Sequence, residues 1–191
     1  MIDWNDEFLE TYTDLYSGYT SPVFWKDQVN NFDHEAAPQF LLDFKHVLDK
    51  HDLKFWLIWG TALGAYRDGQ IIPYDHDMDS AILYDDRRKL LDCTPDLIKA
   101  SITPWIIGVQ PDGLWFRFGR GKCFIDVVLF RMIGDEYHCM KWSTEPKMFD
   151  VEKRISFLDE DFLLPSLPEE YFEDKYGSDW RTPKKNHHCN T

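Results

Sequence analysis

Apolar residues recur every three or four positions in two stretches near the N-terminus, at about 4–19 and 37–48. In the first stretch, the residues with this spacing are Trp4, Phe8, Tyr12, Leu15, Tyr16 and Tyr19. In the second, they are Ala37, Phe40, Leu41, Phe44, Val47 and Leu48. This period is typical of a helix with one buried face, so both stretches are predicted to be helices. Asp33 precedes the second one as its expected N-cap.

From residue 55 onward, apolar residues stand in short runs that predict strands. The runs are FWLIW (55–59), SAILY (80–84), WIIGV (105–109), LWFRFG (114–119), CFIDVVLFRMI (123–133) and EYHCMKW (136–142). The stretch TALGAYRDG predicts a short helix ending at Gly69. Further helices are expected over 85–100, with a break at Pro95, and over 168–176. Helices beside a largely consecutive set of strands predict an α+β, or mixed α/β, fold with a mixed sheet flanked by helices.

The chain has 191 residues and neither an internal repeat nor a Gly/Ser-rich linker, which predicts a single domain. It carries 34 acidic and 21 basic residues, for a net charge of −13. This charge argues against a general nucleic-acid or membrane-surface binder. A phosphorylated ligand would therefore need a local basic patch or a bound metal ion.

The four cysteines show no paired spacing, and the N-terminal residues MIDWNDEFLE do not resemble a signal peptide. No stretch approaches the roughly 18 apolar residues that a membrane span requires. The expectation is a cytoplasmic protein with reduced thiols and no membrane span.

Three aspartates stand at alternate positions: Asp75, Asp77 and Asp79. In an extended segment, alternate side chains share one face, so these carboxylates would lie side by side. Adjacent carboxylates suit Mg²⁺ or Mn²⁺, which prefer oxygen ligands. A solvated acidic loop is the simpler explanation of an isolated pair, but three aspartates next to apolar runs favour a cation site.

An EF-hand calcium loop is an alternative, because the three aspartates would occupy its positions 1, 3 and 5. However, Ser80 stands at position 6, where the turn requires Gly, and Asp86 stands at position 12 in place of Glu. Pro73 also disagrees with a regular helix leading into the loop. The pattern therefore disfavours an EF-hand.

Asp126 lies within the apolar run CFIDVVLF, where a charge is costly unless it is paired or bound to a metal. An ion pair with a nearby arginine or a place at a sheet edge would explain Asp126 alone. Together with Asp77 and Asp79 it completes a three-carboxylate cluster that could hold one or two divalent ions. Gly60 and Thr61 could direct backbone amides toward the phosphate oxygens of a ligand.

The stretch WGTALGAYRDGQIIPYDHDMD resembles the signature of the LicD/fukutin family, whose usual form is G-T-L-L-G-a-x-R-x-G-x-h-I-P-W-D-x-D-h-D. Ala62 replaces a leucine of this signature and Tyr74 replaces the tryptophan. The stretch LLPSLPEEYFEDKYGSDWRTPKKNHH is similar to the closing motif of the family. The similarity extends over about 40–188.

This resemblance implies a nucleotidyltransferase (polymerase β-like) fold and a metal-dependent phosphotransferase. Such an enzyme moves phosphocholine, ribitol phosphate or glycerol phosphate from a CDP-alcohol to a hydroxyl of a glycan or lipid-linked sugar, and it releases CMP. Asp77, Asp79 and Asp126 match the residues that bind Mg²⁺ or Mn²⁺ and carry the catalysis. Asp75 matches the leading aspartate, and Asp126 could also accept the proton of the acceptor hydroxyl.

Three further cations are candidates for contacts with the diphosphate of the donor: Arg67 within the first motif, and Arg181 and Lys184 within the second. On this interpretation 1–50 forms N-terminal helices, 51–143 the catalytic core and 144–191 a closing segment. Two other functions stay open: transfer of a nucleotide from an NTP, and ligand binding by an inactive member of the same fold. The sequence does not separate the possible donors.

Overall fold

The computed structural model describes residues 7–16, 18, 32–110 and 113–185. Within these ranges nine strands form the sheet, and the order along its main path is β3-β4-β5-β2-β1-β9-β8. The strands are β1 (Trp56–Leu57), β2 (Met78–Leu83), β3 (Thr103–Gln110), β4 (Gly113–Arg120), β5 (Cys123–Ile133), β6 (Glu136–Cys139), β7 (Trp142–Thr144), β8 (Lys153–Phe157) and β9 (Glu160–Leu164). β2 and β5 are parallel, as are β1 and β9, while the β1–β2, β3–β4, β4–β5 and β8–β9 pairs are antiparallel. The prediction of a mixed sheet is confirmed.

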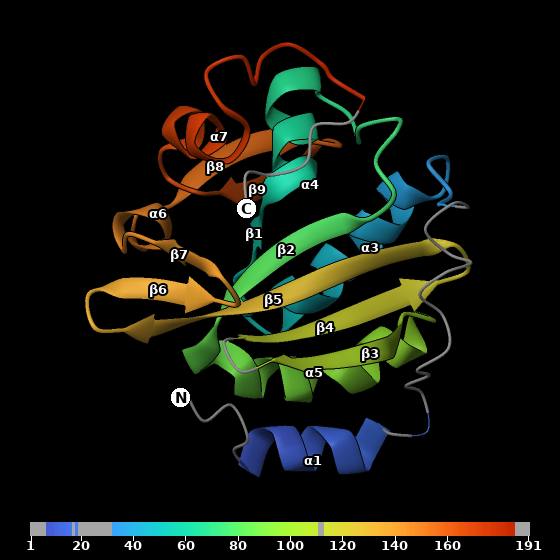
Figure 1. Ribbon diagram of the computed structural model, residues 1–191. Helices are drawn as coiled ribbons and strands as arrows, with labels where there is room; N and C mark the ends of the chain where they lie inside the picture. Colours follow the sequence, from blue (N-terminus) through green and yellow to red (C-terminus); the bar gives the residue numbers. More distant parts are fainter. Residues whose placement is uncertain (1–6, 17, 19–31, 111–112, 186–191) are drawn as a thin grey trace.

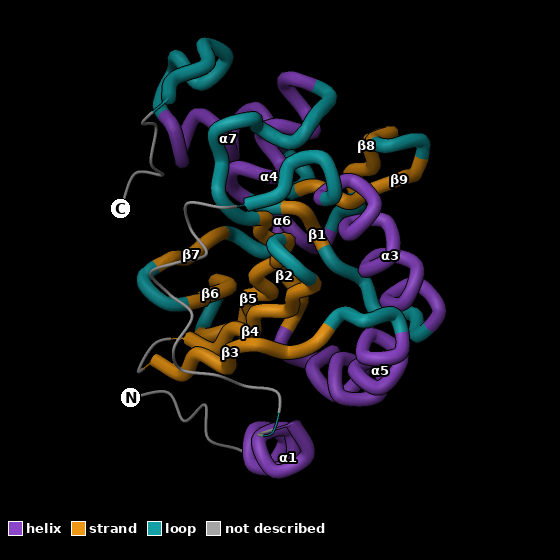
Figure 2. The backbone as a smooth tube through the Cα atoms, turned by 90° about the vertical axis from the view of Figure 1, so that its right-hand side faces the viewer, coloured by secondary structure: helices purple, strands orange, loops and turns teal. Residues whose placement is uncertain are grey.

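Helices flank this sheet, as predicted. The α-helices are α1 (Glu7–Tyr16), α3 (Ala37–Lys50), α4 (Trp59–Leu63), α5 (Arg87–Lys99), α6 (Lys147–Asp150) and α7 (Pro168–Tyr176). A π-helical turn (Gly64–Asp68) continues α4, and a 3-10 turn (Tyr84–Asp86) precedes α5. Figure 2 shows α3 and α5 on one side of the strands, with α1 below β3 and α5 in that view. α4 and α7 pack together near β1 and β9 (Figures 1 and 2).

The predicted apolar face of α3 is buried: Ala37, Phe40, Leu41, Phe44 and Leu48 are each fully shielded from solvent. Burial of each of the leucine and phenylalanine side chains contributes about 1.5–3 kcal/mol and fixes the helix on the sheet. α1 is attached by Tyr12, whose ring lies 4.7 Å from that of Phe116 and whose hydroxyl lies 3.0 Å from Thr94 Oγ1.

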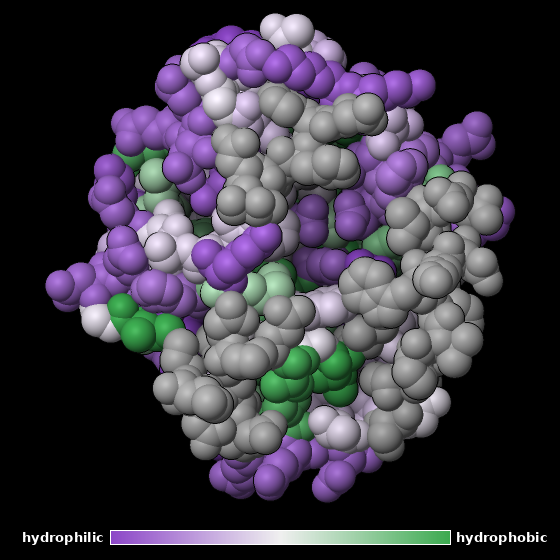
Figure 3. Space-filling view, in the orientation of Figure 1, coloured by the Kyte–Doolittle hydropathy of each residue, from purple (hydrophilic) through white to green (hydrophobic). Residues whose placement is uncertain are grey.

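The prediction of which residues form the buried face of the first helix is partly wrong. Leu15 is 60% exposed, while Phe8, Leu9 and Tyr16 are buried, because the side of α1 that meets the protein is centred on Tyr12. Trp4 and Tyr19 lie outside the described residues. Hydrophilic residues cover most of the described surface in Figure 3, and the hydrophobic residues there form small separate patches. Within the described residues, no helix combines the length and the apolar character that crossing a membrane requires.

Several predicted elements differ from the structure. The strand expected over 55–59 is limited to Trp56–Leu57, because Trp59 takes a positive φ of 47° and begins α4. α5 continues through Pro95, since its buried side chains hold it against the rest of the protein. The strand expected over 136–142 is a hairpin, with Met140 at a positive φ of 53° between β6 and β7. β8, β9 and α6 were not predicted.

Three predicted helix ends can be compared with the structure. The short helix does end at Gly69, which adopts the left-handed conformation (φ 64°) that favours glycine. The helix over 168–176 is present as α7. Asp33 does not cap α3 directly, because Ala36 occupies the N-cap position. Asp33 Oδ1 instead accepts hydrogen bonds from the backbone N–H groups of Glu35 and Ala36, each at 3.1 Å, and so stabilises the turn before the helix.

Candidate active site

Three of the predicted aspartates converge where β2 and β5 run side by side. The parallel register places Asp79 directly opposite Asp126, and Asp77 lies in the loop just before β2. Each of the three offers a carboxylate oxygen, and these oxygens lie within 4.8 Å of one another. Residues separated by 47 positions therefore form one cluster through strand pairing, which makes it a candidate metal site.

Asp75 lies beside this cluster, but it is not in a strand. The hydrogen-bonded strand begins at Met78, so the expected extended segment over 75–79 is limited to its last residues. Asp75 packs against Gly60 in α4: a Cβ atom at Gly60 would lie 2.2 Å from Asp75 Oδ2. The absence of a side chain at Gly60 is therefore what allows Asp75 to approach α4.

The hydroxyl of Thr61 has a positioning role that the sequence did not reveal. Thr61 Oγ1 accepts a hydrogen bond of 2.8 Å from the backbone N–H of Asp79, and the residue is 3% exposed. Ile58 donates its backbone N–H to the carbonyl of Asp79 at 3.3 Å. These two bonds attach the start of β2 to the β1–α4 junction. Whether the backbone amides of Gly60 and Thr61 contact phosphate stays a prediction.

Arg117 on β4 is a site residue that no motif in the sequence indicated. It is 4% exposed, and its Nε and Nη2 atoms donate to Asp126 Oδ1 and Oδ2 at 2.6 and 2.7 Å. Its guanidinium also stacks 4.1 Å from the ring centroid of Phe124. An arginine within the apolar run LWFRFG was a usable signal, because a buried charge needs a partner.

Burial and mutual repulsion disfavour the charged forms of the acidic residues. Burial, and then the neighbouring Asp75, raise the pKa of Asp77 to about 6, and burial also raises the pKa of Asp75. The pKa of Asp79 is raised well above its usual value by burial and by the charges of Asp77 and Asp126. Burial raises the pKa of Asp126 to about 6, although Arg117 opposes this shift. One buried guanidinium thus faces an excess of acidic groups, as a site built for a divalent cation requires.

A cavity of about 410 Å³ opens in front of these carboxylates. Its walls come from α4, the π-helical turn, the loop before β2, α7 and the segment after α7. The lining residues are Trp59, Gly60, Leu63, Arg67, Ile72, Tyr74, Asp75, His76, Asp77, Asp79, Tyr176, Lys184 and Lys185. Asp77 and Asp79 border the cavity, whereas Asp126 is not part of its wall. The volume suits a small-molecule ligand.

The three predicted cations occupy different positions around the cavity. Arg67 lines it, but its guanidinium donates to Asp68 at 2.7 and 2.8 Å and to the carbonyl of Trp180 at 3.0 Å. Lys184 also lines the cavity and forms an ion pair with Asp179. Arg181 does not line it.

Arg181 instead pairs with Glu169 at 2.9 Å and lies over the Trp180 ring. Lys185, next to Lys184, does line the cavity. The segment after α7 therefore brings lysines to the site, while its arginine stays outside.

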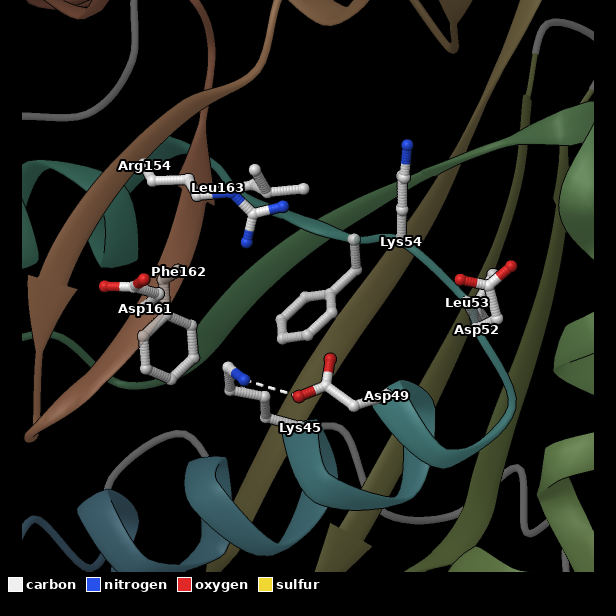
Figure 4. A pocket seen from close by; sticks show the side chains of 10 residues that line it. Lys45, Asp49, Asp52, Leu53, Lys54, Arg154, Asp161, Phe162 and Leu163 are labelled. Atoms are coloured by element: carbon white, nitrogen blue, oxygen red, sulfur yellow. Dashed lines mark hydrogen bonds and ion pairs between the residues drawn. The ribbon is translucent and has the colours of Figure 1, made fainter.

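A second cavity, of about 270 Å³, lies between α3 and the strands β8 and β9 (Figure 4). Its three cationic residues are each paired with an acidic one: Lys45 with Asp49 at 2.5 Å, Lys54 with Glu152 at 2.8 Å, and Arg154 also with Glu152 at 2.7 Å. The wall of this cavity holds three basic residues (Lys45, Lys54 and Arg154) and three acidic ones (Asp49, Asp52 and Asp161), so neither sign of charge is in excess. The cavity beside Asp77 and Asp79 is therefore the candidate active site.

Comparison with solved structures defines the class of fold. The crystal structure of ANT(2")-Ia in complex with adenylyl-2"-tobramycin superposes with a TM-score of 0.51 and 15% identity, covering 76% of this chain and 78% of that one. The solution structure of ANT(2")-Ia gives a TM-score of 0.52 and 14% identity, with 80% of each chain covered. At these identities the likeness shows the fold alone, which is nucleotidyltransferase-like, as predicted.

Residues 52–166 match the family model described as LicD/FKTN/FKRP, nucleotidyltransferase domain. This match covers more than half of the chain, and the chain belongs to the LicD/FKTN/FKRP family.

The ribitol-5-phosphate transferase FKTN of Homo sapiens is 28% identical over 165 residues, covering 79% of this chain and 34% of the human protein. An uncharacterised protein of Rickettsia typhi is 42% identical over 117 residues, covering 61% of this chain and 36% of that protein. The chain thus spans about a third of the length of these relatives.

Proposed function

We propose that this chain is a metal-dependent phosphotransferase of the LicD type. It would move a phospho-alcohol, such as ribitol phosphate, glycerol phosphate or phosphocholine, from a CDP-alcohol to a hydroxyl of a glycan or lipid-linked sugar, with release of CMP. The observation that carries the proposal is the convergence of the Asp77, Asp79 and Asp126 oxygens within 4.8 Å. Membership of the family and the similarity to a ribitol-5-phosphate transferase support it.

The donor set fits Mg²⁺ or Mn²⁺. Each of the three residues supplies a hard carboxylate oxygen, and the cluster holds more acidic groups than Arg117 alone can balance. A bound divalent ion would neutralise negative charge on the diphosphate of the donor. Asp77 and Asp79 would be the ligands on the cavity side, because both line it.

In the proposed reaction, the acceptor oxygen attacks the phosphorus that carries the alcohol. The bond from this phosphorus to the bridging oxygen breaks, and CMP leaves with the electron pair of that bond. The proton of the acceptor hydroxyl passes to a carboxylate, for which Asp126 is the candidate. Arg117 occupies one acceptor position on each Asp126 oxygen, and each oxygen keeps a second lone pair for a metal ion or a proton.

The cations around the cavity would orient the diphosphate. Lys184 and Lys185, from the segment after α7, line the same cavity as Asp77 and Asp79, and Lys184 could leave Asp179 for a phosphate oxygen. Arg67 would act mainly by holding this segment, because its guanidinium binds the Trp180 carbonyl. A direct phosphate contact for Arg67 or Arg181 stays a prediction.

Calorimetric titration with CDP-choline, CDP-ribitol and CDP-glycerol, in Mg²⁺ or in EDTA, tests the proposal without an acceptor. We expect one of the three to bind in Mg²⁺ and to lose binding in EDTA or in Asp77→Asn. Asp159→Asn is a matched control, since it removes the same charge from an exposed turn. If CTP or ATP binds in a Mg²⁺-dependent manner and no CDP-alcohol does, the reaction is nucleotide transfer instead. If none of these ligands binds and Mg²⁺ has no effect, the proposal is overturned.

A further inference from the structure

The start of β2 is held by the junction between β1 and α4, residues 58–61. Thr61 Oγ1 accepts the backbone N–H of Asp79 at 2.8 Å, and the backbone N–H of Ile58 donates to the Asp79 carbonyl at 3.3 Å. Both bonds reach the residue of the carboxylate cluster that lies in β2 and also borders the cavity. The position of the Asp79 carboxylate therefore depends on the conformation of the junction.

The junction contains a strained residue. Trp59 has a φ of 47°, which is unfavourable for a bulky side chain, whereas Ile58 before it is extended (φ −132°, ψ 171°). This change turns the chain from β1 directly into α4, where Thr61 meets the start of β2. A strained conformation persists only where its surroundings hold it, so a contact that fixes Trp59 also fixes the junction.

Tyr171 on α7 provides such a contact. Trp59 is the first residue of α4, a position at which a helix offers no carbonyl partner for the backbone N–H. This N–H instead donates to the Tyr171 hydroxyl at 3.1 Å, and Tyr171 is 6% exposed. α7 lies beside α4 in both views (Figures 1 and 2). One hydrogen bond between residues 112 positions apart thus supports the strained turn.

Aromatic packing fixes α7 beside the π-helical turn that continues α4. The ring of Phe172 lies 5.5 Å from that of Tyr66 and 5.2 Å from that of Trp180. Phe172 is fully buried, and Trp180 is 3% exposed. Tyr171, the neighbour of Phe172, therefore presents its hydroxyl from a well-packed element, as the precise placement of a ligand group requires.

We propose that Tyr171 is a positioning residue for Asp79, the candidate metal ligand, an inference that rests on the proposed function. Its hydroxyl holds the backbone N–H of Trp59, and Trp59 fixes the junction. Ile58 and Thr61 in turn hold the backbone of Asp79. Tyr171 does not line the cavity, so it acts on the site without touching the ligand. Loss of an outer contact that orients a metal ligand typically weakens metal affinity 10–100-fold, so about tenfold is expected for Tyr171→Phe.

Two measurements test this role. Amide hydrogen exchange of the metal-free protein, followed by NMR, reports how firmly the backbone N–H of Asp79 is held, and EPR titration with Mn²⁺ reports metal affinity. In Tyr171→Phe we expect exchange at Asp79 to accelerate more than exchange within β4 and β5, and Mn²⁺ to bind about tenfold more weakly. Tyr12→Phe is the control: it removes another buried hydroxyl, which lies 3.0 Å from Thr94 Oγ1 between α1 and α5. It should lower the Tm and cause neither effect.

A double-mutant cycle with Thr61→Val tests the path. If both residues act through the junction, the double variant loses less Mn²⁺ affinity than the product of the two single losses. Losses that simply multiply would show separate routes and overturn the path through Trp59.

The hydrogen-exchange measurement keeps this inference distinct from the proposed function. If Tyr171→Phe changes exchange at Asp79 and Mn²⁺ affinity no more than Tyr12→Phe does, the inference is overturned and the proposed function stands. If Tyr171→Phe accelerates exchange at Asp79 but the wild type binds no Mn²⁺, the positioning of Asp79 stands and the proposed function fails instead.

Discussion

Arg117 holds both carboxylate oxygens of Asp126 across the β4–β5 pair, with N–O distances of 2.6 and 2.7 Å. The two residues are direct partners in the strand register, and Asp126 is also the partner of Asp79 on β2. Arg117, Asp126 and Asp79 therefore form a row across β4, β5 and β2, which begins at a buried cation and ends at the cavity. Arg117 compensates Asp126, the carboxylate of the three that does not line the cavity, while Asp77 and Asp79 border it.

Replacing Arg117 by methionine should destabilise the fold by about 3–5 kcal/mol, because the change leaves the Asp126 charge buried without its partner. Urea unfolding of the metal-free protein measures this loss. Arg120→Met is the control: Arg120 lies on the same strand, and its pair with Asp43 is about one-third exposed, so a cost of at most about 1 kcal/mol is expected. The double variant Arg117→Met/Asp126→Asn should recover part of the loss. Equal losses in the free energy of unfolding for Arg117→Met and Arg120→Met would show that the buried pair contributes no more to stability than the exposed one.

Local patterns in the sequence predicted the individual elements better than the contacts between them. The period of α3 and the apolar runs of β2, β4 and β5 depend on side chains a few positions apart, and these elements are present. β8 and β9 were missed because charged residues interrupt the stretch KRISFLDEDFLL, and β8 lies at the exposed edge of the sheet. The bend at Trp59 was missed because apolar character does not report the sign of φ.

In the candidate site, too, local patterns were visible in the sequence while contacts between distant residues were not. The alternation of Asp77 and Asp79 was visible in the sequence, and the apolar surroundings of Asp126 suggested that it joins them, but their proximity depends on the parallel pairing of β2 with β5, which no local pattern predicts. Arg117 was a buried-looking charge without an identifiable partner until the β4–β5 register was known. The role of the Thr61 hydroxyl depends on a backbone N–H that lies 18 positions away, and no local pattern encodes it.

Thr61→Val should cost about 1–3 kcal/mol, because an apolar side chain of similar shape leaves the backbone N–H of Asp79 buried and unsatisfied. We also expect weaker Mg²⁺-dependent donor binding, since the start of β2 carries Asp79. Thr61→Ser retains the acceptor oxygen and should preserve most of the donor affinity. Chemical denaturation and calorimetry of the two variants check this. Similar affinities in both variants would contradict the positioning role of the hydroxyl.

The acidic cluster should make the metal-free protein less stable as the pH rises from about 4 to 6. Burial raises the pKa of Asp77 and of Asp126 to about 6, so in this window the folded state binds more protons than the unfolded state does. The contribution of these two carboxylates to the free energy of unfolding therefore falls as the pH rises, and it is lost at pH 7, where both are charged.

Asp77→Asn should accordingly raise the Tm of the metal-free protein at pH 7 by roughly 2–4 °C, the shift that about 1 kcal/mol produces in a chain of this size. Mg²⁺ should stabilise the wild type more at pH 7 than at pH 5, because protons compete for the same oxygens. Thermal unfolding at both pH values, with Asp159→Asn as the matched loss of charge, measures both effects. An Asp77→Asn variant that is less stable than Asp159→Asn at pH 7 would contradict the expected repulsion.

Gly60→Ala should disturb the site through Asp75. The added Cβ would lie 2.2 Å from Asp75 Oδ2, too close for any real contact, so the carboxylate must move. Alanine otherwise favours a helix by about 1 kcal/mol over glycine, and Gly60 lies within α4. We therefore expect a small change in stability and about a tenfold loss of Mg²⁺-dependent donor affinity, which a shift of about 1 Å at a binding group can produce.

The Asp75→Ala background isolates this contact, because it removes the carboxylate that the new methyl group would meet. In that background Gly60→Ala should be neutral or stabilising, and it should cause no further loss of donor affinity. A double-mutant cycle over the two positions, with stability from urea unfolding and affinity from calorimetry, gives the coupling energy directly. Equal effects of Gly60→Ala with and without the Asp75 carboxylate would show that the glycine serves a different purpose, such as the approach of the ligand itself to α4.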